Sequence, residues 1–220
     1  SKFWYGIVAK IGFKKALIVA RSVQAREFIS KYCKNVSDTI IDHGVNIEKF
    51  TPCREKDNQF AISSQLISRK HIEKSIEAFA KYLNKYDDSA KLYIMGDGDE
   101  KENLRKLTKD LGADKNIIFT GKLGHNKLIE ILKKSIAMLV YTEKDNNMVS
   151  VVESIALATP VITTDIPYNA SYIKAEKLGI VNNNWNEDDL RKLAASDEYI
   201  NNCMNCLLYT SPSPRDKRQS

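Results

Sequence analysis

The stretch from Tyr141 to Thr164, YTEKDNNMVSVVESIALATPVITT, decides the fold. It begins at the end of a short apolar run, Met138–Tyr141, of the kind that forms a buried parallel strand. A polar loop follows, and then an amphipathic helix that ends near Pro160. The apolar face of this helix carries Val149, Val152, Ile155 and Ala156. Because a second strand begins at Val161, the stretch predicts one strand–helix–strand unit of a parallel α/β sheet.

Two carboxylates flank the start of that helix. Asp145 precedes it and Glu153 lies inside it, with seven residues between them. A helix N-terminus offers unpaired backbone amides and a partial positive charge, and therefore binds anions. A carboxylate beside it can accept two hydrogen bonds from a sugar cis-diol. These parts suit a sugar nucleotide, and a solvated acidic loop before an ordinary core helix is the alternative. The amides concerned belong to Asn146, Asn147, Met148 and Val149.

The rest of the chain alternates strands with helices. Strands are expected at 16–20, 38–41, 60–63, 91–95, 116–120, 138–141, 161–163 and 179–181. Besides the central helix and one before residue 16, helices are expected at 22–32, 71–83, 100–111, 126–134, 169–174 and 187–195. This alternation predicts an α/β fold with a doubly wound, Rossmann-like parallel sheet. Ligands of such sheets bind beyond the carboxyl ends of the strands. Those ends are expected at Ser64, Gly96, Gly121, Thr142 and Thr164.

Further motifs stand at these strand ends and before the sheet. The loop Ser64-Gln-Leu-Ile-Ser-Arg-Lys70 ends in a lysine, a point charge suited to phosphate. A surface lysine at a helix start is the alternative, although the positive helix end disfavours a cation there. The turn Gly96-Asp-Gly98 lacks the third glycine of a dinucleotide motif. Phe119-Thr-Gly121 ends a strand, and His43–Pro52, HGVNIEKFTP, precedes the sheet.

The order of these motifs resembles the donor-binding part of family-four retaining glycosyltransferases of the GT-B fold. Their signature of an acid, seven residues, a glutamate and then Pro-Val is matched by Asp145, NNMVSVV, Glu153 and Pro160-Val161. The chain departs from the pattern at several positions. The first acid is Asp instead of Glu, and Asn146-Asn147-Met148 replaces a glycine-rich turn. In the basic loop Gln65 replaces an arginine, while Ser64 and His71 replace glycines.

The resemblance implies retaining transfer of a sugar from a nucleotide sugar, which we expect to be a UDP-sugar, to a glycan or lipid-linked acceptor of bacterial surface-polysaccharide assembly. It implies that Glu153 binds the ribose diol, Asp145 the donor-sugar hydroxyls and Lys70 the pyrophosphate. Main-chain groups after Phe119 would read the base. The remaining expected nucleotide contacts are Ser64, Gln65, Gly96, Gly121, Lys122 and Leu123. No cofactor or metal is expected, because the histidines show no metal-ligand spacing.

Composition limits the remaining classes. The 220 residues suffice for one α/β domain and an extra piece, and no run of eighteen apolar residues predicts a membrane span. The net charge of +6 suits anionic lipid or nucleotides as well as an ordinary mixed surface, and nucleic acid is not an expected partner. The four cysteines favour a reduced chain. We expect a cytoplasmic protein, with peripheral contact at the inner face of the membrane left open.

The expected domain organisation has three parts. Residues 1–52 would be the end of an N-terminal acceptor domain with the interdomain segment, and residues 53–205 the nucleotide-sugar domain. The segment CLLYTSPSPRD, Cys206 to Asp216, resembles the translated adapter of a sequencing library, so residues 206–220 are left out of the expected fold as disordered. A genuine Ser/Pro-rich tail is the alternative. Because most of the acceptor domain would be missing, we expect little or no sugar transfer by this chain alone.

Two other functions stay open. One is a GT-B-like epimerase or phosphorylase, although a phosphorylase would need a pyridoxal-binding lysine motif that the sequence does not show. The other is a nucleotide-binding module without catalysis. Gln65 and the absent glycine turn at Asn146-Asn147 favour this second possibility.

Overall fold

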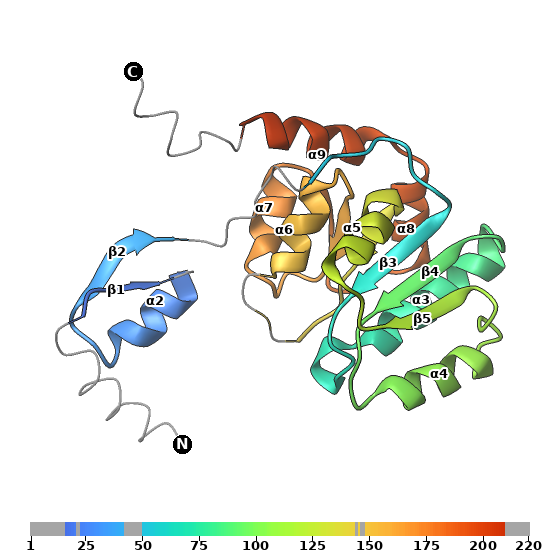
Figure 1. Ribbon diagram of the computed structural model, residues 1–220, viewed down its shortest axis with the longest axis horizontal. Helices are drawn as coiled ribbons and strands as arrows, with labels where there is room; N and C mark the ends of the chain where they lie inside the picture. Colours follow the sequence, from blue (N-terminus) through green and yellow to red (C-terminus); the bar gives the residue numbers. More distant parts are fainter. Residues whose placement is uncertain (1–15, 21–22, 42–49, 144, 146–147, 210–220) are drawn as a thin grey trace. The chain divides into compact units, whose positions relative to one another are not determined.

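The computed structural model describes residues 16–20, 23–41, 50–143, 145 and 148–209. The chain forms two compact units, residues 1–45 and 46–220 (Figure 1). In the first unit, β1 (Ile18–Ala20) and β2 (Val36–Ile40) pair in parallel and are joined by α2 (Val23–Ser30). The predicted strand, helix and strand are confirmed with slightly shifted ends. The helix expected before residue 16 lies outside the described residues.

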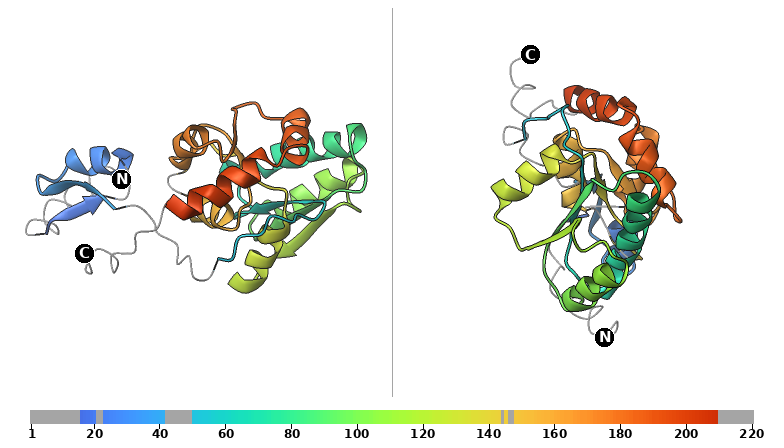
Figure 2. Two further views of the ribbon diagram at one scale, coloured as in Figure 1. Left: turned by 90° about the horizontal axis from the view of Figure 1, so that it is seen from above. Right: turned by 90° about the vertical axis from the view of Figure 1, so that its right-hand side faces the viewer.

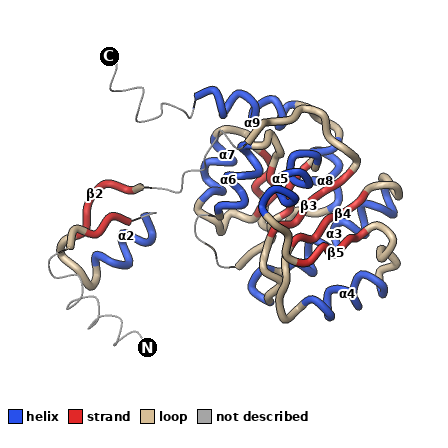
Figure 3. The backbone as a smooth tube through the Cα atoms, in the orientation of Figure 1, coloured by secondary structure: helices blue, strands red, loops and turns tan. Residues whose placement is uncertain are grey.

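The second unit is built on a six-stranded parallel sheet with the strand order β5-β4-β3-β6-β7-β8. Figure 3 shows its strands in red between the blue helices. The strands are β3 (Gln59–Ser63), β4 (Lys91–Met95), β5 (Ile117–Gly121), β6 (Ala137–Leu139), β7 (Val161–Thr163) and β8 (Gly179–Val181). The order reverses direction beside β3, where the chain returns from β5 to β6. This is the doubly wound sheet that the alternating sequence predicts.

Helices cover both faces of this sheet. They are α3 (Ile72–Lys85), α4 (Lys101–Asp110), α5 (His125–Lys134), α6 (Val149–Ala156), α7 (Asn169–Ala175), α8 (Glu187–Ala194) and α9 (Glu198–Tyr209), with a short 3-10 helix, η2 (Ser68–Lys70). The helix α3 packs against α4 and α8, whereas α6 packs against α5 and α9. The right-hand view of Figure 2 shows the sheet between α5 on one side and α3 with α4 on the other. The chain moves from β3 toward β5 in one direction across the sheet and from β6 toward β8 in the other. Because each crossover is right-handed, the helices of these two halves lie on opposite faces.

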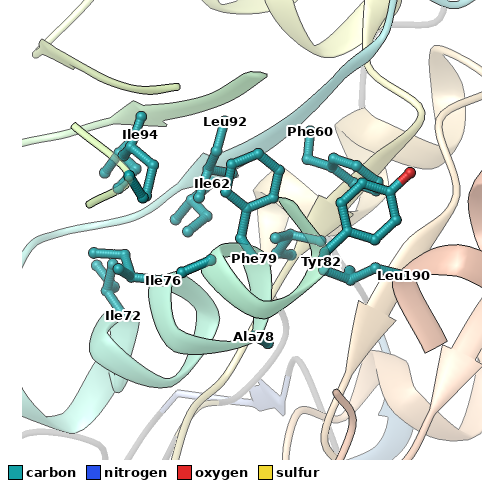
Figure 4. Packing of buried hydrophobic residues seen from close by; sticks show 14 of the residues in the cluster. Phe60, Ile62, Ile72, Ile76, Ala78, Phe79, Tyr82, Leu92, Ile94 and Leu190 are labelled. Atoms are coloured by element: carbon teal, nitrogen blue, oxygen red, sulfur yellow. The ribbon is translucent and has the colours of Figure 1, made fainter. Parts of the chain in front are cut away.

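The core beneath α3 is aromatic and aliphatic. Phe60 of β3 meets Phe79 and Tyr82 of α3 edge-on, with ring centroids 5.8 Å and 5.4 Å away. All three side chains are almost fully buried, and Figure 4 shows them packed beside Leu190 of α8. Ile62 of β3 and Leu92 and Ile94 of β4 belong to the same buried cluster. This burial fixes the register of the central strands and therefore the positions of their carboxyl ends.

A lysine anchors the segment that enters the sheet. The ammonium of Lys56 donates to the carbonyl of Lys133 at 2.9 Å, to the hydroxyl of Thr159 at 2.9 Å and to the carbonyl of Leu157 at 3.5 Å. Lys133 and Leu157 are at the C-terminal ends of α5 and α6, where unpaired carbonyls attract a cation. Burial nevertheless lowers the pKa of Lys56 to about 8. The lysine thus joins two helix ends to the segment before β3.

The C-terminal end differs from the expectation. Helix α9 was not predicted, and its backbone stays helical to Tyr209, past the boundary expected at Asn205. Within it Cys203 is fully buried, and Cys206 Sγ lies 2.7 Å from the Tyr172 hydroxyl. Residues 210–220 lie outside the described residues. In the part of the chain that is described, no helix combines the length and apolar character needed to cross a bilayer.

Candidate functional site

The loop after β3 rests on two glycines of the turn after β4. A Cβ on Gly96 would lie 1.8 Å from the carbonyl oxygen of Ser64, and one on Gly98 would lie 2.2 Å from that of Leu66. The buried Leu66 donates its amide to the Asp97 carbonyl and accepts from the Glu100 amide, each at 3.0 Å. The glycines of the G-D-G turn are therefore needed for close backbone packing, which holds the basic loop against the end of β4.

His71 ends this loop in a left-handed conformation, with φ 41°. It occupies the position where the resemblance predicts glycine, and a side chain there strains the backbone. Its Nδ1 lies 2.7 Å from Glu73 Oε1, while Nε2 lies 2.8 Å from Glu143 Oε1 without being aligned for a hydrogen bond. The hydrogen bond with Glu73, aided by Glu143, raises the pKa of His71. The two carboxylates thus stabilise a histidine where the backbone favours glycine.

Lys70 and Asp145 form an ion pair between the loop after β3 and the loop after β6. Their side chains are only 11% and 18% exposed. The backbone joins the same loops, because the carbonyl of Arg69 accepts from the amide of Glu143 and the hydroxyl of Thr142, both at 3.2 Å. The predicted phosphate cation and the predicted sugar-binding acid are therefore neighbours.

Three of the predicted nucleotide contacts line one small cavity. Ser64, Lys70 and Met148 surround a space of about 10 Å³, together with apolar residues of β3 and β6. Such a cavity is small enough that a ligand would lie at its mouth and not inside it. The strand ends of β3 and β6 and the start of α6 thus converge, as the parallel sheet predicts.

The N-terminus of α6 is partly occupied. The amide of Met148 donates to Asn169 Oδ1 at 2.7 Å, and Asn169, at the start of α7, is buried. This amide was predicted to meet phosphate, and in this structure a side chain already satisfies it. Val149 begins α6 with 39% of its surface exposed. The other two predicted amides, those of Asn146 and Asn147, lie outside the described residues.

Glu153 lies about one turn into α6 and pairs with a histidine. His125 Nε2 is 2.9 Å from Glu153 Oε1, with the carboxylate side chain 14% exposed and the imidazole 52% exposed. His125 is the first residue of α5. The ring of Phe50, which is buried, meets the imidazole edge-on at 6.0 Å. Glu153 is five positions after Met148, roughly 7.5 Å along the helix axis.

The predicted base contacts lie at the end of β5. Gly121 has φ 70° and accepts a hydrogen bond from the amide of Gly96 at 3.0 Å. Lys122 is exposed, and Leu123 lines an open, apolar hollow of about 390 Å³ with residues of α5. Gln65, predicted to replace a phosphate-binding arginine, is exposed, and its carbonyl accepts from the amide of Ile67.

Sequence reasoning missed the residues that hold the predicted site residues in place. The sequence predicts no role for His125, because the histidines show no metal-ligand spacing, and none for Asn169. His125 carried a signal, because it stands between the F-x-G segment at a predicted strand end and the helix predicted from residue 126. Asn169 carried none, because its contact with Met148 depends on how α7 packs against α6. Among the described residues, no group of three or more His, Cys, Asp or Glu side chains could hold a metal ion.

Comparison with known proteins gives a consistent match. A family model described as glycosyl transferases group 1 matches residues 46–198. The alpha-monoglucosyldiacylglycerol synthase of Streptococcus pneumoniae is 26% identical over 178 residues, covering 74% of this chain and 40% of that protein. The O-antigen chain mannosyltransferase RfbU of Salmonella typhimurium is 27% identical over 172 residues, covering 76% of this chain and 47% of that protein. The chain thus spans less than half the length of both relatives.

A solved structure extends the match to the fold. The crystal structure of an S. aureus TarM mutant in complex with Fondaparinux, alpha-GlcNAc-glycerol and UDP superimposes with a TM-score of 0.76. The two proteins are 20% identical, and the match covers 96% of this chain and 44% of that one. At this identity the likeness shows the fold alone, which is the Rossmann-like, C-terminal domain architecture of GT-B proteins.

Proposed function

The chain belongs to the glycosyl transferases group 1 family, and from this premise we propose that its second unit is the nucleotide-sugar donor site of a retaining glycosyltransferase. One observation carries the proposal. Lys70 and Asp145, a cation suited to phosphate and an acid suited to sugar hydroxyls, meet at the carboxyl edge of the sheet beside the start of α6. A nucleotide sugar needs these two groups at neighbouring positions.

The positions of the other residues support an extended nucleotide across this edge. The pyrophosphate would lie at Lys70 and the N-terminus of α6, where amides and the helix dipole favour anions. Glu153, roughly 7.5 Å farther along α6, would accept the ribose hydroxyls. The base would lie toward Leu123 and its apolar hollow. This order follows the order of parts in a nucleoside diphosphate.

The chemistry of the proposed reaction needs stabilisation of a leaving group. When the bond between the sugar and the diphosphate breaks, negative charge accumulates on the leaving diphosphate. Lys70 and the helix dipole at the start of α6 would stabilise that charge, while Asp145 would hold the donor-sugar hydroxyls. Retention at the anomeric carbon, a UDP-linked hexose donor and the absence of any bound cofactor or metal are parts of the proposal. UDP in the structurally similar TarM complex supports the choice of nucleotide.

We propose a glycan or lipid-linked acceptor, because the similar proteins are named as a diacylglycerol glycolipid synthase and an O-antigen mannosyltransferase. Acceptor binding would involve the first unit, as the end of an acceptor domain, and donor use would be cytoplasmic. The first unit leaves Leu17, Phe28 and Ile41 half-exposed or more, as expected of elements that pack in a larger sheet. We therefore expect this chain to bind the donor with little or no transfer of its sugar.

Calorimetric titration of UDP, GDP and ADP into the full chain tests the proposal. UDP should bind most tightly, and Glu153→Ala should weaken UDP binding at least tenfold, about 1.4 kcal/mol. Glu102→Ala, which removes an exposed acid of α4, is the matched control and should leave the isotherm unchanged. The wild-type isotherm should also be the same in EDTA and in Mg²⁺. A folded wild-type chain that binds none of the three nucleotides would refute the donor site.

A non-catalytic nucleotide-binding module is the second candidate, and one observation favours it. Gln65 is an exposed, uncharged side chain where the family resemblance predicts an arginine for the pyrophosphate. Both candidates predict UDP binding that depends on Glu153. They differ in whether a protein that includes the complete acceptor domain releases sugar from UDP-sugars. Release of sugar by that longer protein, abolished by Asp145→Ala, would decide for the enzyme.

A further inference from the structure

A histidine outside the predicted site is in direct contact with the acid proposed to bind ribose. His125 Nε2 lies 2.9 Å from Glu153 Oε1. Within the described residues, no recorded hydrogen bond or ion pair reaches Oε2 of the same carboxylate. The carboxylate side chain is 14% exposed, so it has a protein partner on one oxygen and an approach from solvent. One oxygen of this carboxylate is thus held by the protein, and the side chain remains partly open to solvent.

The burial of Glu153 makes this contact consequential. A mostly buried carboxylate without a partner is unfavourable, and it would rotate toward whatever donor or water lies nearest. A hydrogen bond from an imidazole N–H removes that freedom and fixes the plane of the carboxylate. Binding a diol depends on that plane, because the two hydroxyls must reach acceptor lone pairs in fixed directions.

Phe50 holds the histidine in turn. Its ring meets the imidazole edge-on, with centroids 6.0 Å apart and planes at 80°. Phe50 is 7% exposed although it lies in the segment before β3, outside any helix or strand. A buried aromatic ring restricts the rotamers of the half-exposed imidazole. Three side chains from separate parts of the second unit therefore form a chain of contacts from Phe50 through His125 to Glu153.

We infer that His125 is a positioning residue, held by Phe50, that orients the Glu153 carboxylate for the ribose hydroxyls of the nucleotide. The inference rests on the proposed donor site. It assigns to His125 no contact with the nucleotide itself. Its effect must therefore pass through the interaction between Glu153 and the ribose diol, and must vanish for a nucleotide that lacks the diol.

The test compares UDP with 2′,3′-dideoxyuridine diphosphate on the full chain. His125→Ala should weaken UDP binding about tenfold, which is about 1.4 kcal/mol and matches the loss of one hydrogen bond to a charged group. The same substitution should leave binding of the dideoxy nucleotide within about twofold. His125→Gln should restore most of the UDP affinity, because the Gln Nε2 amide is separated from Cα by as many bonds as the imidazole Nε2 and also donates a hydrogen bond.

Two further variants control for nonspecific effects. Asn84→Ala removes a neutral, exposed side chain near the end of α3, at none of the proposed nucleotide contacts, and should change neither isotherm. Phe50→Leu keeps a large apolar side chain but loses the edge contact, and should lower UDP affinity about threefold without affecting the dideoxy nucleotide. Circular dichroism and urea unfolding show that each variant is folded. Because His125→Ala leaves the mostly buried Glu153 carboxylate without this partner, its unfolding midpoint should fall modestly, and the dideoxy nucleotide separates that loss of stability from a loss of ribose binding.

The outcomes separate this inference from the proposed function. UDP binding that depends on Glu153 but not on His125 overturns the inference and leaves the donor site intact. Equal losses for UDP and the dideoxy nucleotide in His125→Ala overturn it as well, because the histidine would then contact the base or phosphates. Absence of UDP binding by the folded wild type overturns the proposed function and the inference together.

Discussion

Gly96 is a position where the second unit is sensitive to a single methyl group. In Gly96→Ala the new Cβ would lie 1.8 Å from the carbonyl oxygen of Ser64 and 2.9 Å from its carbonyl carbon. The obstacle is backbone at the end of β3 and not the tip of a flexible side chain. Gly96 also has φ 150°, a conformation that residues with a Cβ rarely adopt. Relief therefore requires movement of the main chain.

The size of that movement sets the expected loss. Opening the contact from 1.8 Å to the 3.0 Å limit for Cβ contacts moves the Ser64 carbonyl by at least about 1.2 Å. Ser64 pairs with β4, because its amide donates to the Met95 carbonyl at 3.1 Å, so the movement also strains the central strands. Overpacking of this kind, combined with the backbone strain, costs on the order of 3–4 kcal/mol. UDP affinity should fall with it, because the displaced loop carries Lys70.

Urea unfolding followed by circular dichroism measures this loss against two other glycines. Gly112 has φ 66° with no atom within 4 Å of an added Cβ, so Gly112→Ala should cost about 1 kcal/mol for the left-handed backbone alone. Gly124 has φ −65° and equally open surroundings, so Gly124→Ala should lie within about 0.5 kcal/mol of wild type. If Gly96→Ala were no less stable than Gly112→Ala, the close approach of the Ser64 carbonyl would be refuted.

Two further predictions concern titratable groups. The pKa of Lys56 is about 8 in the folded chain, against an ordinary value of 10.5. Between these two pH values the unfolded chain binds more protons than the folded one. The free energy of unfolding should therefore rise with pH over this range, by up to about 3 kcal/mol. The unfolding free energy of the wild type minus that of Lys56→Met should therefore increase from pH 8 to pH 10.5. A difference that does not change with pH would contradict the lowered pKa of Lys56. His71→Gly removes left-handed strain and should stabilise the chain by about 1 kcal/mol at pH 8.5. The raised pKa of His71 adds stability to the wild type that is fully present below pH 6.5 and is lost as the pH rises through the folded-state pKa. The stabilisation by His71→Gly should therefore be smaller at pH 6 than at pH 8.5. Urea unfolding at both pH values measures this difference.

Periodicity and strand ends were enough to predict the second unit. The strands at Lys91–Met95, Val161–Thr163 and Gly179–Val181 have the bounds that the sequence indicated. Apolar runs between polar loops specify buried parallel strands because both faces of such a sheet are covered. Helix α9 was missed, since its residues Glu198–Tyr209 carry a weak apolar pattern and its position depends on packing against α6.

In the candidate site, too, some contacts could be predicted from local sequence and others depend on how distant helices pack. Lys70 and Asp145 could be predicted as neighbours, because parallel strands bring their carboxyl ends to one edge. The occupied amide of Met148 could not be predicted, since its acceptor, Asn169, belongs to a different helix. The partner of Glu153 was also hidden, because nothing in the local sequence places the start of α5 beside the middle of α6. Tertiary packing between helices supplies what the motif alone leaves open.

The charges at the sheet edge explain how Lys70 and Asp145 can pair with each other and also serve the proposed ligand. Lys70 and Asp145 are largely buried, and either charge alone would be strongly disfavoured there. Without a ligand each neutralises the other. A diphosphate that reaches Lys70 would replace Asp145 as its anionic partner, and the Asp145 carboxylate could then accept hydrogen bonds from the hydroxyls of a donor sugar. UDP alone brings the phosphates without those hydroxyls. In the proposed site a UDP-sugar should therefore bind more tightly than UDP, and Asp145→Asn, which leaves Lys70 unpaired, should reverse that order by strengthening the binding of UDP.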